Sequence, residues 1–264
     1  MKGRWLIALA ALSFLATLVL HAPAALLYSR QAAKAPDNAV RLHGVQGTLS
    51  QGGFSALTVN TRVVLTDARW TLHPLWLGLL RLSADLETGG DAVLRASVSR
   101  AVFGKLRWSR VDAAASVKTL LGATGQAVLP VEGQVRLDLP LVLLDAGLPV
   151  HAEGMAEVQG LAWTLAREPL LLGDFSAALS TDDKGILAVL SSGPGPLELS
   201  GEARLSEDRS YDLHLQLKPR AEAGAQLQSL VRSLGQPDLQ GWYHIRRQGR
   251  FEQREQETGD GGRG

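Results

Sequence analysis

The sequence predicts a mainly β fold, in which a single N-terminal transmembrane helix is followed by a curved, mostly antiparallel β-sheet domain with two short helices. Three observations predict it. The chain begins with a long uncharged segment. Beyond it, apolar and polar residues alternate along much of the chain, and short polar turns separate the alternating runs. Alternation with a period of two is typical of strands with one buried face, and such turns join antiparallel neighbours.

The uncharged segment spans residues 5–28 and follows two positive residues, Lys2 and Arg4. As a helix it would be about 36 Å long, enough to cross the hydrocarbon core of a bilayer. Positive charge on the short side predicts that residues 1–4 stay in the cytoplasm and that the rest is exported. We therefore expect a single-pass protein of the inner membrane, in contact with the lipid bilayer through residues 5–28, with its C-terminal domain in the periplasm.

A cleaved signal peptide is the alternative interpretation of this segment. Small residues at Ala22 and Ala24 fit the pattern of a cleavage site. However, apolar residues continue through Leu26, Leu27 and Tyr28, beyond the length of a typical signal-peptide core, which favours a retained anchor. Both interpretations place the body of the protein in the periplasm.

The remainder of the chain divides by composition into three parts. Residues 29–38 are polar, small and proline-containing, and they predict a linker. Residues 39–251 carry the alternating pattern and predict the periplasmic β domain. Residues 252–264 are charged and Gly-rich without an aliphatic residue, so they predict a disordered tail.

The alternation predicts a sheet with one dry face and one wet face. It is strictest in FSALTVNTRVVLT, LRLSADLE, VEGQVRLDL, LELSGEARLS and YDLHLQLK. Strands buried on both faces of a parallel sheet would show continuous apolar runs instead. We interpret the dry face as an apolar groove that the few predicted helices leave partly open. Its predicted lining is Leu57, Val59, Leu80, Leu82, Leu137, Leu213 and Leu215.

Turns and helices follow from the segments between these runs. Compact polar segments predict hairpins at residues 87–91, 181–185 and 206–210. Apolar residues at helical spacing, stopped by a glycine and then a proline, predict a helix within residues 221–235. A weaker pattern predicts a second helix within residues 114–122.

Two stretches about ninety residues apart share the order Trp-Thr-Leu, Pro-Leu, Leu-Gly: WTLHPLWLG at residues 70–78 and WTLAREPLLLG at residues 163–173. We interpret the tryptophan as a packing anchor, the proline as a bend or edge between strands, and the glycine as part of the tight turn that follows. The hypothesis is a pair of duplicated β-lobes, residues 39–150 and 151–251, stacked into one curved sheet. The predicted repeat anchors are Trp70, Pro74, Gly78, Trp163, Pro169 and Gly173.

No pattern of residues points to catalysis, to a cofactor or to a metal. The 27 Lys and Arg nearly balance the 26 Asp and Glu, so no basic field favours nucleic acid as a partner. Cysteine is absent, which excludes disulfides and thiolate metal sites. His151 and Glu153 are two residues apart, and we interpret them as solvent-facing strand residues, not metal ligands. The tryptophans mostly predict packing on the dry face.

Several stretches, taken in order, resemble the type II secretion system protein N family, also called the general secretion pathway N family. They are GVQGTLSQGGFSALTV, ARWTLHPLWLGLLRLSADL, VEGQVRLDL, VQGLAWTLAREPLLLGDF, GPLELSGEARLSEDRSYDLHLQLKP and GWYHIRRQGRF. The resemblance covers nearly all of residues 1–251, and the order and spacing carry it. It implies an inner-membrane component of the machinery that exports folded proteins across the outer membrane. It also implies other inner-membrane or periplasmic secretion components as partners, and no catalytic residues.

A second resemblance provides the alternative function. Membrane-tethered proteins of the AsmA type also combine one span with a long curved sheet, and their strand starts are similar to Gly195-Pro196-Leu197 with Gly201 here. This resemblance implies a groove that binds or moves lipid, which would make lipid a partner. An apolar face filled entirely by the protein's own side chains would exclude it.

Overall fold

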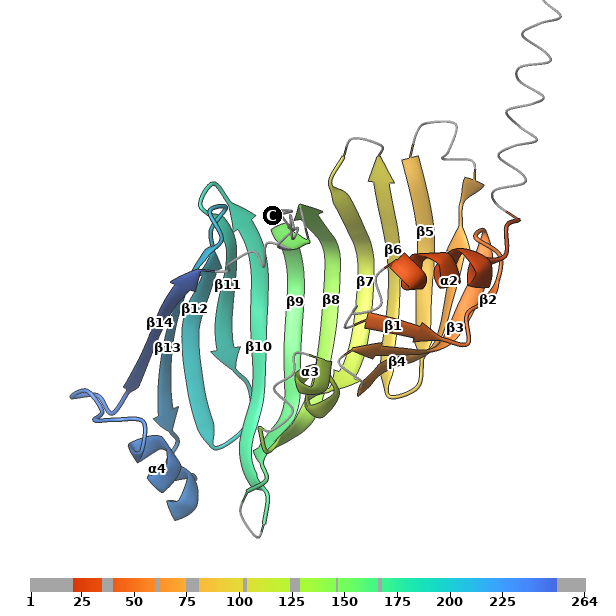
Figure 1. Cartoon of the computed structure of the whole chain (residues 1–264). Coiled ribbons are helices and arrows are strands. Elements are labelled where there is room, and N and C mark those ends of the chain that lie inside the picture. The colour runs from red at the N-terminus through yellow and green to blue at the C-terminus, as the bar shows by residue number, and fades with distance from the viewer. Residues whose placement is uncertain are drawn as a thin grey trace, which may run out of the picture.

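The computed structural model describes residues 21–34, 40–59, 62–74, 81–101, 104–123, 129–145, 147–165 and 168–250. These residues form one open, fourteen-stranded sheet in which every paired strand is antiparallel. From β3 to β14 each strand pairs with its neighbour in sequence, while β1 and the two-residue β2 both pair with β3 (Figure 1). The predicted mainly β, antiparallel fold is confirmed.

The bounds of the described elements, in chain order, are α2 (Ala24–Lys34), β1 (Val40–His43), β2 (Gln46–Gly47), β3 (Gln51–Val59), β4 (Arg62–Leu72), β5 (Arg81–Gly89), β6 (Ala92–Ala101), β7 (Leu106–Ser116), α3 (Val117–Ala123), β8 (Val131–Asp145), β9 (Leu148–Trp163), β10 (Leu170–Asp182), β11 (Gly185–Ser192), β12 (Leu197–Leu205), β13 (Ser210–Pro219), α4 (Ala225–Arg232) and β14 (Tyr243–Arg250). All three predicted hairpins are confirmed, because tight turns join β5 to β6, β10 to β11 and β12 to β13.

The register of the strands places one apolar residue beside another across nine strands, from β6 to β14. Directly paired residues of an antiparallel sheet share a face, so this set, called the apolar row below, lies on one face of the sheet. Every member is half-buried. The apolar row consists of Leu94, Ala113, Leu137, Ala156, Ala177, Leu190, Gly201, Leu215 and Ile245.

The neighbouring row on the opposite face is hydrophilic, as alternation requires. This polar row consists of Arg136, Glu157, Ser176, Ser191, Ser200, Gln216 and His244. Of the predicted groove lining, Leu137 and Leu215 lie in the apolar row itself, and Leu213 lies two residues from Leu215 on the same strand. Leu80 lies outside the described residues.

Bulges interrupt the ladder at positions that the alternation does not reveal. Asp67 in β4 and Arg110 in β7 have φ angles of 50° and 53°. The pairing of β4 with β5 and of β6 with β7 shifts register beside these two residues. A left-handed residue in a bulge bends its strand and increases the local twist. The sheet is correspondingly curved (Figure 1).

The helix predicted within residues 114–122 begins later than expected. Residues 114–116 continue β7, where they pair with Arg136, Val135 and Gln134 of β8. The helix α3 starts only after Ser116, whose Oγ accepts a hydrogen bond from the Thr119 N–H over 3.0 Å. A serine oxygen that satisfies a free N–H of the first turn is a strong start signal for a helix.

The helix predicted within residues 221–235 is shorter, at Ala225–Arg232, and it builds the core at the C-terminal end of the sheet. Leu227 and Val231 are 1% and 2% exposed. They pack with three buried strand residues, Leu197, Leu217 and Tyr243. Figure 1 shows α4 at the lower left corner of the sheet, and α3 lies in front of the middle strands.

The N-terminal segment joins the sheet earlier than the sequence predicts. Ala22 accepts a hydrogen bond from the Leu49 N–H, Pro23 forms an isolated bridge with Thr48, and helix α2 extends through Lys34. The residues predicted as the end of the membrane span and as the start of the linker are therefore attached to the β domain. No helix among the described residues is long and apolar enough to cross a membrane. Residues 5–20 and the predicted tail lie outside the described residues.

The predicted junction between two lobes falls inside a strand. Residues 150 and 151 are both part of β9, which pairs with β8 on one side and β10 on the other. The sheet is therefore continuous across the expected boundary. The two similar stretches do occupy corresponding places, each at the end of a strand that precedes a hairpin, namely β4 before β5–β6 and β9 before β10–β11. The duplication itself stays a prediction.

Candidate functional site

The two tryptophans among the repeat anchors pair with apolar residues of neighbouring strands. Trp70 pairs with Leu86, and Trp163 pairs with Leu170, which packs against the α4 core. Trp70 is the more tightly held of the two tryptophans. Its ring centroid is 6.5 Å from that of Phe54, and its Nε1 donates a 3.1 Å hydrogen bond to the Leu49 carbonyl.

The remaining anchors play different parts in the two copies. Pro74 follows the end of β4, and Pro169 immediately precedes β10, so both prolines lie between strands. Gly173 is not in a tight turn as predicted. It lies within β10 at a bulge, with φ +124°, and its Cα approaches Gly195 so closely that a side chain would meet backbone atoms. Gly78 lies outside the described residues.

The described residues leave the apolar face partly exposed. Of the large side chains in the described part of the protein, Leu227 is the one with less than 2% exposure. Trp108 pairs with Val98 and Val142 on this face, and its buried Nε1 has no hydrogen-bond partner among the described residues. The sequence alone did not identify the row members on β9 and β10, because Ala156 and Ala177 are small and gain significance only from the register.

A trio of chemically suggestive residues gathers on the polar face of β5 and β6. His73 Nε2 is 2.7 Å from Asp85 Oδ2, and the Ser97 hydroxyl donates to Asp85 Oδ1 over 2.5 Å. Catalytic triads place the histidine between the serine and the carboxylate, so that it can take the serine proton. Here the carboxylate lies in the middle, so this arrangement leaves the serine without a base. The sequence shows no signal for it because the pairing of β4 with β5 brings His73 to Asp85, and the pairing of β5 with β6 brings Ser97 to Asp85.

These contacts should make the free energy of unfolding fall at acid pH. The hydrogen bond from Ser97, then that from His73, hold the pKa of Asp85 below its usual value. The pKa values of Asp182, Asp208 and Asp238 are lowered as well, chiefly by hydrogen bonds from Arg204, Ser210 and His244. A lowered folded-state pKa means that stabilisation is present above the unfolded-state value of about 3.9 and is lost as the pH falls through the folded-state value.

We expect the free energy of unfolding to be constant from about pH 7 to 5 and to fall below about pH 4. Urea titrations at pH values from 3 to 7 measure it. The variant Asp85→Asn removes one of the contributing groups and should lose less of its own stability between pH 5 and 3. A free energy of unfolding that rises on acidification would contradict the assignment of these hydrogen bonds.

Several other titratable residues of the described chain form ion pairs, and Asp212 lies within 4 Å of both His214 and Arg246. His151 Nε2 lies 3.0 Å from Glu153 Oε1, and Arg204 forms two hydrogen bonds to the Asp182 carboxylate. Within the described residues, no group of three or more His, Asp or Glu side chains is placed to hold a metal ion. Surface pairs of this kind contribute modestly to stability and supply no chemistry.

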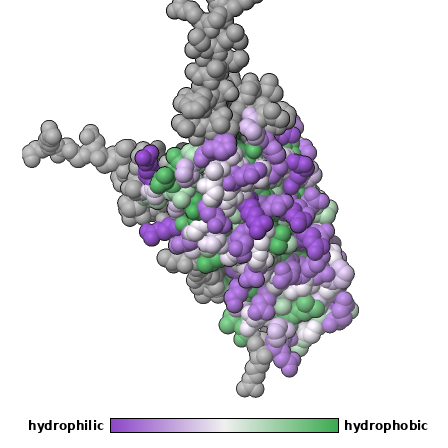
Figure 2. All heavy atoms as spheres, turned by 90° about the vertical axis from the view of Figure 1, so that its right-hand side faces the viewer, coloured by the Kyte–Doolittle hydropathy of each residue, from purple (hydrophilic) through white to green (hydrophobic). Residues whose placement is uncertain are grey.

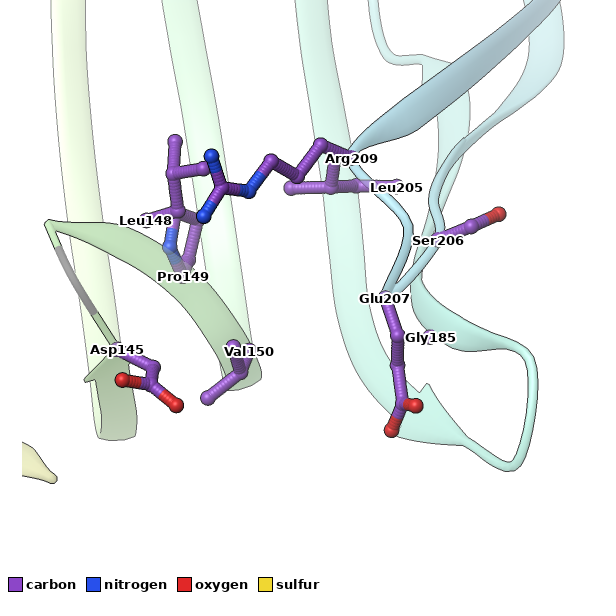
Figure 3. Close-up of a pocket in the computed structure, with 9 residues that line it drawn as sticks. All are labelled: Asp145, Leu148, Pro149, Val150, Gly185, Leu205, Ser206, Glu207 and Arg209. Carbon is purple, nitrogen blue, oxygen red and sulfur yellow. The ribbon is translucent and has the colours of Figure 1, made fainter. Parts of the chain in front are cut away.

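A small cavity of about 200 Å³ lies where the ends of three hairpins meet, at the β8–β9, β10–β11 and β12–β13 turns. Figure 3 shows the Arg209 side chain extending toward Leu148 and Pro149, while the carboxylates of Asp145 and Glu207 point away from it. The lining holds neither a nucleophile beside a base nor a pair of facing carboxylates. The cavity therefore shows no arrangement for nucleophilic or acid–base catalysis.

The surface at the N-terminal end of the sheet is mainly hydrophilic. Figure 2 views the molecule from this end and shows hydrophilic residues with small separate hydrophobic areas among them. A contiguous apolar patch would mark an interaction site. The apolar row crosses nine strands, β6–β14, and it is the candidate functional surface.

Comparisons with known proteins identify the family. Residues 38–246 match the family model described as type II secretion system (T2SS), protein N. The chain is 31% identical to a curated type II secretion system protein N from Aeromonas hydrophila, over 95% of this chain and 100% of that protein. No solved structure matches. These matches favour a role in type II secretion over the alternative of lipid movement. The chain belongs to the type II secretion system protein N family.

Proposed function

We propose that this protein is a membrane-anchored component of the type II secretion system that takes part in exporting folded proteins across the outer membrane by binding other components, without catalysis. The observation that carries the proposal is the half-buried apolar row across nine strands. Apolar side chains that keep part of their surface in water are stabilised when a partner covers that surface, by about 25 cal/mol per Å². The family provides the partners, which are other secretion components in the inner membrane or the periplasm.

The dimensions of the row suit a protein–protein interface. Neighbouring strands are about 4.8 Å apart, so nine strands extend over about 38 Å. A standard interface buries about 800 Å² on each partner, a patch of comparable width.

The proposed location is the inner membrane, with a single span and the β domain in the periplasm. Lys2 and Arg4 support this orientation. Residues 5–21 contain no charged residue apart from the titratable His21, and as a helix they would be about 25 Å long. The proposed span ends earlier than residue 28 because Ala22 and Pro23 already bond to the sheet.

Adjacent residues on one strand provide a matched test of the apolar row. Leu190 belongs to the apolar row and Ser191 to the polar row, so Leu190→Lys and Ser191→Lys place the same charge on opposite faces of β11. We expect Leu190→Lys to lower the release of secreted proteins about tenfold, because a charge in an interface core must be desolvated, and Ser191→Lys to leave release unchanged. The measurement is the secreted fraction in cells that lack the chromosomal copy and produce each variant.

Two controls accompany this experiment. Circular dichroism and protease resistance of the purified variants establish that both are folded. Fractionation should place the protein in the inner membrane, with the β domain accessible to protease only after the outer membrane is opened. Equal secretion by the two variants, with both folded, would refute the role of the apolar row.

A further inference from the structure

The two edges of the open sheet differ in how far the chain protects them. At the N-terminal edge, β1 is four residues long, and the Leu42 N–H donates a 2.7 Å hydrogen bond to the Tyr28 hydroxyl of helix α2. A short strand whose outward N–H already has a partner is a poor template for another strand. This edge is therefore partly closed.

The C-terminal edge is longer and open. β14 has eight residues, and all eight pair with β13 on one side (Figure 1). On the other side, no strand of the described chain pairs with it. No hydrogen bond from elsewhere in the described chain reaches its backbone. An edge strand of this length presents a row of free N–H and C=O groups that another extended segment can pair with.

The charge of β14 selects which segment can pair. The strand contains Arg246, Arg247 and Arg250 and no acidic residue, and all three arginines are exposed. Arg246 and Arg250 are near Asp212 and Asp208, at 3.7 and 3.4 Å, but their side chains remain 64% and 66% exposed. Two copies of β14 placed edge to edge would bring arginines together, and like charges on paired strands are destabilising. A second copy of this chain is therefore disfavoured, and an acidic strand is favoured.

The two faces of β14 further define the partner. Arg246 pairs with His214 and lies on the polar face, whereas Ile245 pairs with Leu215 and lies in the apolar row. A strand added beside β14 would continue both faces. Its acidic side chains would lie beside Arg246 and Arg250 on the polar face, and an apolar side chain would lie beside Ile245 on the other face. Arg247, which pairs with Leu213, shares the face of Ile245 and adds a positive charge there.

We propose that the free edge of β14 binds an extended segment of a partner protein, with alternating acidic and apolar residues, as an additional strand of the sheet. The inference rests on the proposed function in that the partner is another secretion component. Backbone hydrogen bonds supply affinity in this mode, and side-chain alternation supplies specificity. The added strand also lengthens the apolar row by one position.

Peptides of defined sequence test the proposal on the full-length protein in detergent. The probe is a labelled peptide of about nine residues in which Glu and Val alternate, and fluorescence anisotropy measures its binding. The matched control peptide alternates Glu and Pro, which keeps the charge but removes every second N–H donor and cannot form a ladder. We expect binding of the Glu-Val peptide and at least tenfold weaker binding of the Glu-Pro peptide. Equal binding of the two peptides would mean that charge attraction alone accounts for the binding, and it would overturn the proposal.

Matched variants locate the site on β14. Arg246→Glu should weaken binding of the Glu-Val peptide about tenfold, because it replaces attraction by repulsion, whereas Arg136→Glu, on the interior strand β8, should leave binding unchanged. Equal effects of the two substitutions would contradict an edge site. The chain has no cysteine, so single cysteines introduced along β14 can be crosslinked to a peptide with one cysteine without background. Strand addition predicts crosslinks at every second position of β14.

Two further outcomes would assign the edge to a different occupant. Dimers in solution that Arg246→Glu dissociates would assign it to a second copy. A variant ending at Arg250 that binds the Glu-Val peptide at least tenfold more tightly would assign it to the acidic C-terminal residues of the chain. Secretion by the Leu190→Lys variant is measured independently. Normal secretion by this variant would refute the proposed function, whereas failure of the peptide to bind would refute only the edge site.

Discussion

Leu227→Ala should lower the free energy of unfolding by about 3 kcal/mol, within the 2–5 kcal/mol that such truncations of buried leucines cost. Leu227 is 1% exposed and, together with Val231, packs α4 on β12, β13 and β14. The cost has two parts, namely the lost transfer free energy of the removed methyl groups and the cavity that remains. Because the described core is small, few other contacts compensate.

Urea denaturation followed by circular dichroism measures this loss. The matched control is Leu239→Ala, because Leu239 is fully exposed in the segment between α4 and β14 and its truncation should change the free energy by less than about 0.5 kcal/mol. A Leu227→Ala variant as stable as the control would mean that α4 is not part of the cooperative core. The result also bears on the proposed edge site, since α4 supports β14 through Tyr243.

Gly173→Ala should destabilise the protein by about 3 kcal/mol for a backbone reason. Gly173 has φ +124°, a conformation that residues with a side chain rarely adopt. An added Cβ would lie 2.9 Å from the Pro194 carbonyl oxygen and 3.0 Å from the Gly195 Cα, and neither backbone atom can rotate away. The substitution would push β10 away from the segment that precedes β12.

Gly224→Ala provides the matched control for this prediction. Gly224 precedes α4 with φ −62°, and an added Cβ would meet nothing within 4 Å. Its substitution should change the free energy of unfolding by less than about 0.5 kcal/mol. The same denaturation experiment compares the two variants. If Gly173→Ala were as stable as Gly224→Ala, the bulge in β10 would not be constrained by its contact with Gly195.

The sequence was sufficient to predict the class of the fold and its local connections. Alternation in the segments that became β8, β12 and β13 predicted half-buried strands, because the side-chain period of a strand is two and is independent of its neighbours. Polar segments at residues 87–91, 181–185 and 206–210 predicted hairpins for an equally local reason. Family membership followed from the order of these segments and was confirmed by the comparisons.

Element boundaries were predicted less well where tertiary contacts compete with local preference. Residues 114–116 are alanine-rich and suit a helix, but pairing with β8 keeps them in β7 until the Ser116 cap. Gly173 suits a turn, but the approach of Gly195 explains its place within a strand. Residues 29–34 are polar, yet they extend α2, whose Tyr28 bonds to β1.

The sequence by itself therefore determined a β protein with one apolar face, hairpin connections and the family to which it belongs. The tertiary structure alone decided which residues lie side by side. Examples are the apolar row through Leu137, Ala177 and Leu190 and the placement of Asp85 between His73 and Ser97. The arginine-rich edge at β14 is a further example. The physical reason is that periodicity is set by neighbours along the chain, whereas register and edges are set by pairing between residues that are distant in sequence.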